Sequence, residues 1–180
     1  VDPAEEEDSY AKYFRKASFP PDRSKAAFLL PGRRMRTEYR ETIAKIPLDA
    51  ILALAKSKKV TITELLTAVY MAGLQDIYEA LPASKRRRAH KRIAVQVPVN
   101  LRKIYPSRTL RNFFLFTFTH IDTRLGHWEF DEILHRVHHQ MRLGLEEKEL
   151  IRQIRRNVGG ERNVLGRPVL LPLKTVVLRI

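Results

Sequence analysis

Residues 97–114 read V-P-V-N-L-R-K-I-Y-P-S-R-T-L-R-N-F-F, and this stretch decides the fold that we expect. The apolar, β-branched run 93–99 leads into it and predicts a strand that ends at a proline. The run 112–121, rich in phenylalanine and threonine, predicts a second strand. We therefore expect residues 100–110, between the two runs, to form a connecting loop.

Segments with helical periodicity flank the two predicted strands in the sequence. Residues 63–80 are apolar almost all round, and Thr61 with Glu64 matches a capping box, so we predict a helix buried on several sides. A single apolar stripe over 128–143 predicts an amphipathic helix. The order of elements indicates an α/β layer structure. We further expect helices at 49–58 and 146–156, a break at 157–160, candidate edge strands at 26–30 and 37–46, and a basic loop at 83–92.

The composition restricts the classes of function. The chain has 180 residues, is 44% hydrophobic and contains no cysteine, which allows one domain with a core and excludes disulfides and thiolate metal sites. The lack of cysteine suits a reducing compartment, and we expect the cytoplasm. No run of eighteen uncharged apolar residues occurs, so no membrane-spanning helix is expected. The formal net charge of +14 favours an anionic partner, such as a nucleic acid, an anionic membrane face or a phosphate-bearing cofactor.

Two short motifs, which occur in this order where the two predicted strands are joined, resemble those of a known family. They are Pro98-Val99-Asn100-Leu101-Arg102 and Asn112-Phe113-Phe114. They are similar to the second half of CoA-dependent acyltransferases, which include chloramphenicol acetyltransferase, condensation domains, plant acyltransferases of the BAHD type and bacterial alcohol acetyltransferases. The resemblance follows the element order over residues 8–180 and the residue detail mainly over 95–114. It implies a chloramphenicol-acetyltransferase-like half-domain over 26–180, with a mixed or antiparallel sheet layered with helices and a truncated C-terminus. It also implies a linker or crossover over 1–25.

The resemblance also implies roles for individual residues. Arg102 matches the family arginine that pairs with the aspartate of a His-His-x-x-x-Asp-Gly motif on the other half. Asn112 matches the asparagine of a Gly-Asn element whose strand lines the substrate tunnel, and Asn100 and Phe114 would line the same tunnel. Arg111 stands where the family has glycine. The alternatives are a solvated loop arginine at 102 and, at 112, a strand-start asparagine that bonds to local backbone.

By the same resemblance, the protein would move an acyl group from a thioester to an acceptor. The donor would be acyl-CoA or an acyl carrier protein, and the acceptor a small-molecule alcohol or amine. No cofactor is expected to be bound tightly, since the CoA thioester would be a substrate. These 180 residues contain no His-His-x-x-x-Asp-Gly motif, so we expect the N-terminal half of the same polypeptide to be the partner and this part to be inactive alone.

A second pair of histidines imitates the catalytic motif. His138 and His139 are followed by Leu143 where the motif has aspartate, and they lie within a stripe of helical period rather than in a loop. We therefore predict that neither histidine is catalytic and expect no metal site as part of the chemistry. His135 and His139 are four residues apart on one helix face, which allows incidental metal affinity.

Two other classes of function remain open from the sequence. A basic nucleic-acid-binding module is suggested by the charge, although no helix-turn-helix, zinc or RNA-recognition signature supports it and no specific nucleic acid is expected. A non-catalytic membrane- or partner-binding fragment is suggested by the apolar run 169–178. Both ends of the sequence look like cuts in a longer protein.

Overall fold

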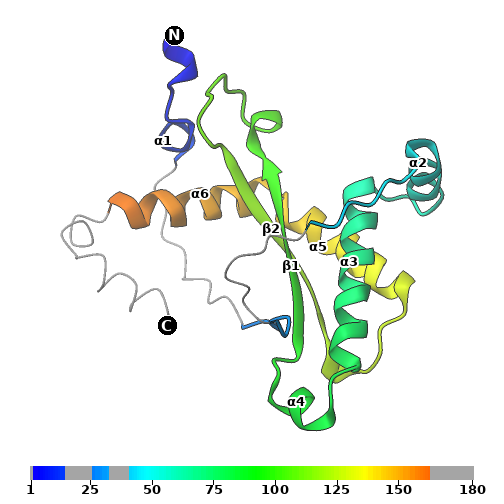
Figure 1. Ribbon diagram of the computed structural model, residues 1–180. Coiled ribbons are helices and arrows are strands. Elements are labelled where there is room, and N and C mark those ends of the chain that lie inside the picture. Colours follow the sequence, from blue (N-terminus) through cyan, green and yellow to red (C-terminus); the bar gives the residue numbers. More distant parts are fainter. Residues whose placement is uncertain (1, 15–25, 33–40, 163–180) are drawn as a thin grey trace. The chain divides into compact units, whose positions relative to one another are not determined.

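The computed structural model describes residues 2–14, 26–32 and 41–162, with side chains up to residue 156 (Figure 1). The chain divides into two compact units. The helical unit comprises Arg23–Val97 and Thr117–Gly144, and the loop unit comprises Val1–Asp22, Pro98–Phe116 and Leu145–Ile180. The arginine cluster at 33–36, the apolar run 169–178 and the segment 37–40 lie outside the described residues.

The described residues form both α-helices and β-strands, so the predicted α/β class is confirmed at this general level. The strands expected at 93–99 and 112–121 and the helices expected at 63–80 and 128–143 are all present. In chain order the elements are η1 (Pro3–Glu5), α1 (Ser9–Tyr13), α2 (Leu48–Ser57), α3 (Ile62–Glu79), α4 (Ala83–Arg88), β1 (Arg92–Asn100), η2 (Leu101–Lys103), β2 (Phe114–Asp122), η3 (Thr123–Leu125), α5 (Phe130–Gly144) and α6 (Glu147–Arg162).

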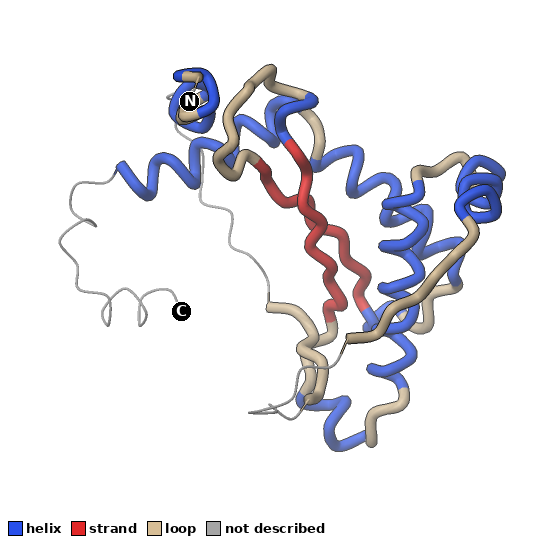
Figure 2. The backbone as a smooth tube through the Cα atoms, turned by 45° about the horizontal axis from the view of Figure 1, so that its top comes forward, coloured by secondary structure: helices blue, strands red, loops and turns tan. Residues whose placement is uncertain are grey.

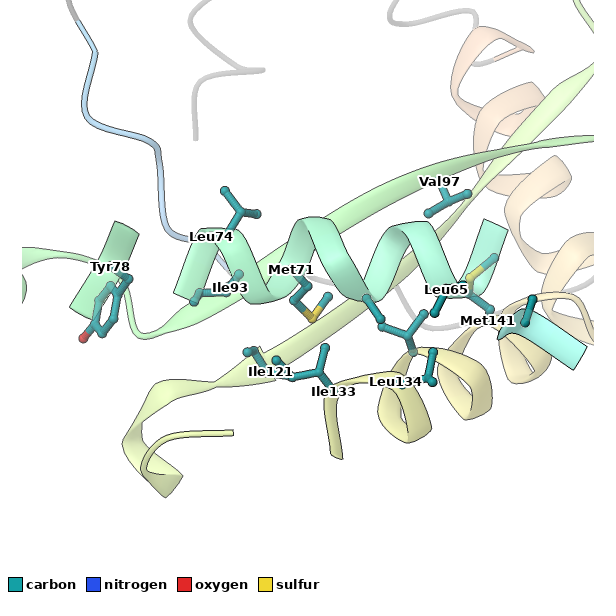
Figure 3. Close-up of a cluster of buried hydrophobic side chains, with 13 residues drawn as sticks. Leu65, Met71, Leu74, Tyr78, Ile93, Val97, Ile121, Ile133, Leu134 and Met141 are labelled. Atoms are coloured by element: carbon teal, nitrogen blue, oxygen red, sulfur yellow. The ribbon is translucent and has the colours of Figure 1, made fainter. Parts of the chain in front are cut away.

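The core of the helical unit lies between α3, α5 and the strands (Figure 3). The predicted capping box starts α3: the Glu64 N–H donates to Thr61 Oγ1 at 3.2 Å, and the Thr61 N–H donates to Glu64 Oε2 at 2.7 Å. Burial of each large apolar side chain contributes about 1.5–3 kcal/mol. The side chains that Figure 3 labels in this core are Leu65, Met71, Leu74, Tyr78, Ile93, Val97, Ile121, Ile133, Leu134 and Met141.

One face of α3 remains exposed. Leu66, Val69, Tyr70 and Ile77 recur at helical spacing and are exposed, whereas Met71 and Leu74 on the other face are buried. The prediction that this helix is buried on several sides is therefore wrong for the described part of the chain.

The two strands run side by side as an antiparallel sheet (Figure 2). Along β2 burial alternates with a period of two, as expected for a strand with one face covered. Leu115, Thr117, Thr119 and Ile121 are buried, whereas Phe118 in the opposite row is exposed. Among the described residues, the hydroxyls of Thr117 and Thr119 have no hydrogen-bond partner.

The loop unit has a separate and more aromatic core. Leu101, Phe113, Leu115, Leu150 and Ile154 are buried together. Aromatic residues of the N-terminal segment and Tyr105 pack against this cluster. The Tyr10 and Phe113 rings meet edge to face, with centroids 5.1 Å apart, an arrangement that aromatic quadrupoles favour. The segment 2–14 thus carries the short helix α1 and packs on this core.

Several local predictions are wrong. Residues 26–30 form no strand: the Phe28 N–H donates to the Arg92 carbonyl at 2.7 Å, but Leu29 is largely exposed. Residues 41–46 likewise form no strand. The expected basic loop contains α4, which starts directly after Pro82 as proline geometry favours. The expected break at 157–160 lies inside α6, where two glycines cost the helix about 1 kcal/mol each without ending it.

In the ranges that the structure describes, none of the helices combines the length and the apolar character needed to cross a membrane.

Candidate functional site

Arg102 organises the loop that joins the two strands. The Asn100 side chain caps η2 by accepting from the Arg102 N–H at 3.0 Å. The guanidinium then reaches across the loop, where Nε and Nη2 donate to the Thr109 carbonyl at 3.0 and 2.8 Å and Nη2 donates to the Arg111 carbonyl at 2.5 Å. The planar guanidinium of Arg102 thus binds two carbonyls across the loop, because its N–H donors point in fixed directions.

The acceptors of Arg102 are neutral. A longer contact of 3.4 Å from Nη1 to Asn100 Oδ1 completes the set. These four contacts occupy at most four of the five N–H groups of a guanidinium. Among the described residues no carboxylate forms an ion pair with Arg102, so its positive charge is not neutralised there. Arg102 is half-buried, and its guanidinium is held by carbonyls of its own loop.

Two tyrosines of the N-terminal segment fix the same loop from outside. Tyr10 donates its hydroxyl to the Phe114 carbonyl and accepts from the Phe114 N–H at 3.0 Å. Tyr13 donates its hydroxyl to the Pro106 carbonyl at 2.5 Å. Thr109 is buried, and its hydroxyl accepts from the Arg111 N–H at 3.2 Å. The loop therefore satisfies its backbone through side chains rather than through a sheet.

A pocket of about 470 Å³ opens beside Arg102. Two of its lining residues are paired, since Lys12 Nζ donates to Glu7 Oε2 at 2.7 Å. Behind them, the buried Ser9 hydroxyl donates to Glu7 Oε1 at 2.9 Å. The hydrogen bonds from Lys12 and Ser9 lower the pKa of Glu7. This hydrogen-bonded network is ionised, and most of its polar atoms bond to one another. The residues that line the pocket are Ala4, Glu7, Lys12, Arg102, Pro106, Ser107 and Arg108.

The structure gathers the predicted site residues only in part. Asn100 and Arg102 are joined directly by the cap and the Nη1 contact. Asn112 is exposed at the far end of the loop, and Phe114 is half-buried as the first residue of β2. The Phe114 ring packs edge to face on Phe116, with centroids 5.2 Å apart. Asn100 and Arg102 form one constellation, whereas Asn112 and Phe114 lie at the start of the second strand.

The histidine pair of α5 lies on a helix, as predicted. Val137 and Met141 point into the core and His139 is exposed. His138 Nδ1 lies 3.3 Å from Oε1 of Glu64, a carboxylate that is only 3% exposed. Burial raises the pKa of Glu64, but the hydrogen bonds from the Thr61 backbone and from His138 outweigh it, so the pKa is lowered overall. His138 thus has a structural contact inside the helical unit.

Sequence reasoning missed the contribution of the N-terminal segment. Tyr10 lies more than a hundred residues before Phe114, and no local pattern predicts their pairing. The Glu64–His138 contact could have been anticipated only in part, since the capping box identifies Glu64 but not its partner across the helix pair. The comparisons add no assignment: the chain matches no family model, no curated protein and no solved structure.

Proposed function

We propose that these residues form the C-terminal part of an acyltransferase, which moves an acyl group from a CoA or carrier-protein thioester to an alcohol or amine. The observation that carries the proposal is the Arg102 loop at the end of β1. An arginine that is held by neutral carbonyls keeps its charge for an anionic partner, because no carboxylate within the described residues neutralises it.

The geometry refines the part that Arg102 would take. The contacts with Thr109, Arg111 and Asn100 leave at least one Nη1 hydrogen for a carboxylate. In the proposal this hydrogen meets the aspartate of a His-His-x-x-x-Asp-Gly loop supplied by the N-terminal half of the polypeptide. Arg102 then couples two loops, its own and the catalytic one, and acts as a positioning residue.

The chemistry would require a base from outside this chain. A histidine on the partner half would accept the proton of the acceptor hydroxyl or amine as its oxygen or nitrogen attacks the thioester carbonyl. The tetrahedral oxyanion would then collapse, the C–S bond would break, and the thiolate would leave with the proton returned from histidine. In the proposal, Asn100, Asn112 and Phe114 of this chain line the wall of the substrate tunnel. We place the reaction in the cytoplasm.

The test is release of CoA thiol. The polypeptide that contains these residues together with an N-terminal half is incubated with acetyl-CoA and a panel of primary alcohols and amines, and free thiol is followed spectroscopically. Thiol release that depends on acceptor and is absent from the isolated 180 residues supports the proposal. Its absence with acyl-CoA and with acyl carrier protein across the panel contradicts it, as does equal activity of the 180 residues alone.

A further inference from the structure

Two imidazoles face each other on the exposed side of α5. His135 Nε2 and His139 Nε2 are 2.9 Å apart, and the ring centroids are 4.2 Å apart. Both residues are exposed and line a pocket of about 370 Å³. At this distance the two nitrogens are within hydrogen-bond range of each other, and the tautomers determine which imidazole donates. The other residues that line the pocket are Lys58, Lys59, Val60, Asp131, Leu134 and His138.

The separation of the two nitrogens suits a chelated metal ion. Imidazole nitrogen binds first-row divalent metals at about 2.0–2.1 Å. Two nitrogens 2.9 Å apart on such bonds subtend an angle of about 90° at the metal, the cis angle of a square-planar or tetragonal ion. A tetrahedral zinc site would need the nitrogens about 3.3–3.4 Å apart.

We propose that His135 and His139 form a two-nitrogen chelate for a divalent metal of tetragonal preference, copper(II) above all, with water at the remaining positions. Copper(II) also heads the affinity order of divalent ions for nitrogen ligands. In the part of the chain that the structure describes, no group of three His, Cys, Asp or Glu side chains could hold a metal. The site therefore binds reversibly through two protein ligands.

The charges around the pair are partly offset. Lys58, the residue that follows α2, contacts Asp131 Oδ1 through its Nζ at 2.6 Å, so this ammonium is paired and the carboxylate one turn before His135 is engaged. His138 Nδ1 is directed toward Glu64, which removes that imidazole nitrogen from the pair. Lys59 also lines the pocket and opposes a cation. These neighbours limit the affinity but leave both Nε2 atoms accessible.

Metal binding would also stabilise the helical unit. The chelate joins two residues one turn apart on α5, the helix whose Ile133 and Val137 are completely buried in the core. An ion that binds this arrangement and not the unfolded chain shifts the folding equilibrium by mass action. A rise in melting temperature with added copper(II) or nickel(II) is therefore a second readout of the same site.

The experiment is a titration of untagged protein with copper(II), followed by calorimetry and by electron paramagnetic resonance. We expect one tight equivalent with nitrogen hyperfine structure from two imidazoles, and at least tenfold weaker binding in His135→Ala and in His139→Ala. His90→Ala, which removes an exposed histidine outside the pocket, is the control and should bind like wild type. Circular dichroism checks that each variant keeps its helices.

Three results would overturn the proposal. Unchanged copper affinity in His139→Ala would place the ion elsewhere, and several equal weak equivalents in wild type would mean nonspecific binding. The melting temperature provides an independent check, since added nickel(II) should raise it for wild type and for His90→Ala but not for His135→Ala. An equal rise in all three proteins would also overturn the assignment.

Discussion

The helical unit and the loop unit are held together in different ways. In the helical unit, aliphatic side chains of α3 and α5 such as Met71, Ile133 and Val137 are completely buried (Figure 3). In the loop unit, Arg102 and Tyr10 bond directly to backbone carbonyls of one loop and strand end. Apolar packing is non-directional and hydrogen bonding is directional. The helical unit should therefore be sensitive to lost volume and the loop unit to the loss of single polar atoms.

The largest expected effect is a cavity in the helical unit. Ile133 is 0% exposed, and Ile133→Ala should lower the free energy of unfolding by about 2–5 kcal/mol, since removed methyl groups leave a void. Leu143→Ala on the same helix is the matched control, because Leu143 is 57% exposed. Urea denaturation of both variants measures the difference. Similar losses in the two variants would contradict the assignment of the core.

The next largest effect is expected when one hydroxyl oxygen is removed from the loop unit. The Tyr10 hydroxyl donates to the Phe114 carbonyl and accepts from its N–H. Tyr10→Phe should lower the free energy of unfolding by about 1–3 kcal/mol, because two backbone groups lose their partner. Tyr70→Phe in the helical unit is the control, as Tyr70 is 56% exposed. If the two substitutions cost the same, the loop unit does not depend on directional bonds.

Much of the helical unit could be predicted from periodicity, whereas little of the loop unit could. The capping box at Thr61 and Glu64 and the stripe of α5 are local signals, and both helices are where the sequence predicts them. The bonds of Arg102 to Thr109 and Arg111 depend on the course of an irregular loop, which no period describes. Arg102 was singled out by resemblance, but its neutral acceptors were not foreseen.

Substitutions at two glycines test the effects of packing and of helix propensity separately. A Cβ at Gly144 would lie 2.2 Å from Thr117 Oγ1, whereas a Cβ at Gly73 meets nothing within 4 Å. Gly144→Ala should therefore lower the free energy of unfolding by about 1–3 kcal/mol through overpacking. Gly73→Ala, inside α3, should raise it by about 0.4–1 kcal/mol. Thermal unfolding of both variants decides the signs, and a stabilising Gly144→Ala would exclude close packing there.

The smallest expected effect is a pH dependence in the helical unit. Hydrogen bonding to the half-buried Glu79 raises the pKa of His127 above its ordinary value of 6.5. A raised pKa means that protonation favours the folded state, so this stabilisation is present below the ordinary value and is lost as the pH rises through the folded value. Glu79→Gln should flatten the stability profile above pH 6.5. A profile that stays unchanged contradicts the pairing.

The measurement that tests the account most directly is the effect of Arg102 on turnover and on stability in the same protein. In the polypeptide that joins these residues to an N-terminal half, Arg102→Ala should lower kcat/KM by about 100-fold or more, because a misplaced catalytic loop costs that much. The free energy of unfolding should also fall, by about 1–3 kcal/mol, because the Thr109 and Arg111 carbonyls lose their donor. Arg102→Lys should restore activity only in part, since an ammonium cannot form the fork. Arg108→Ala, which removes an arginine of the same loop that is 71% exposed, should stay within about threefold of wild type. If folded Arg102→Ala turns over like Arg108→Ala, then Arg102 only shapes its own loop and the proposed coupling to a catalytic half is wrong.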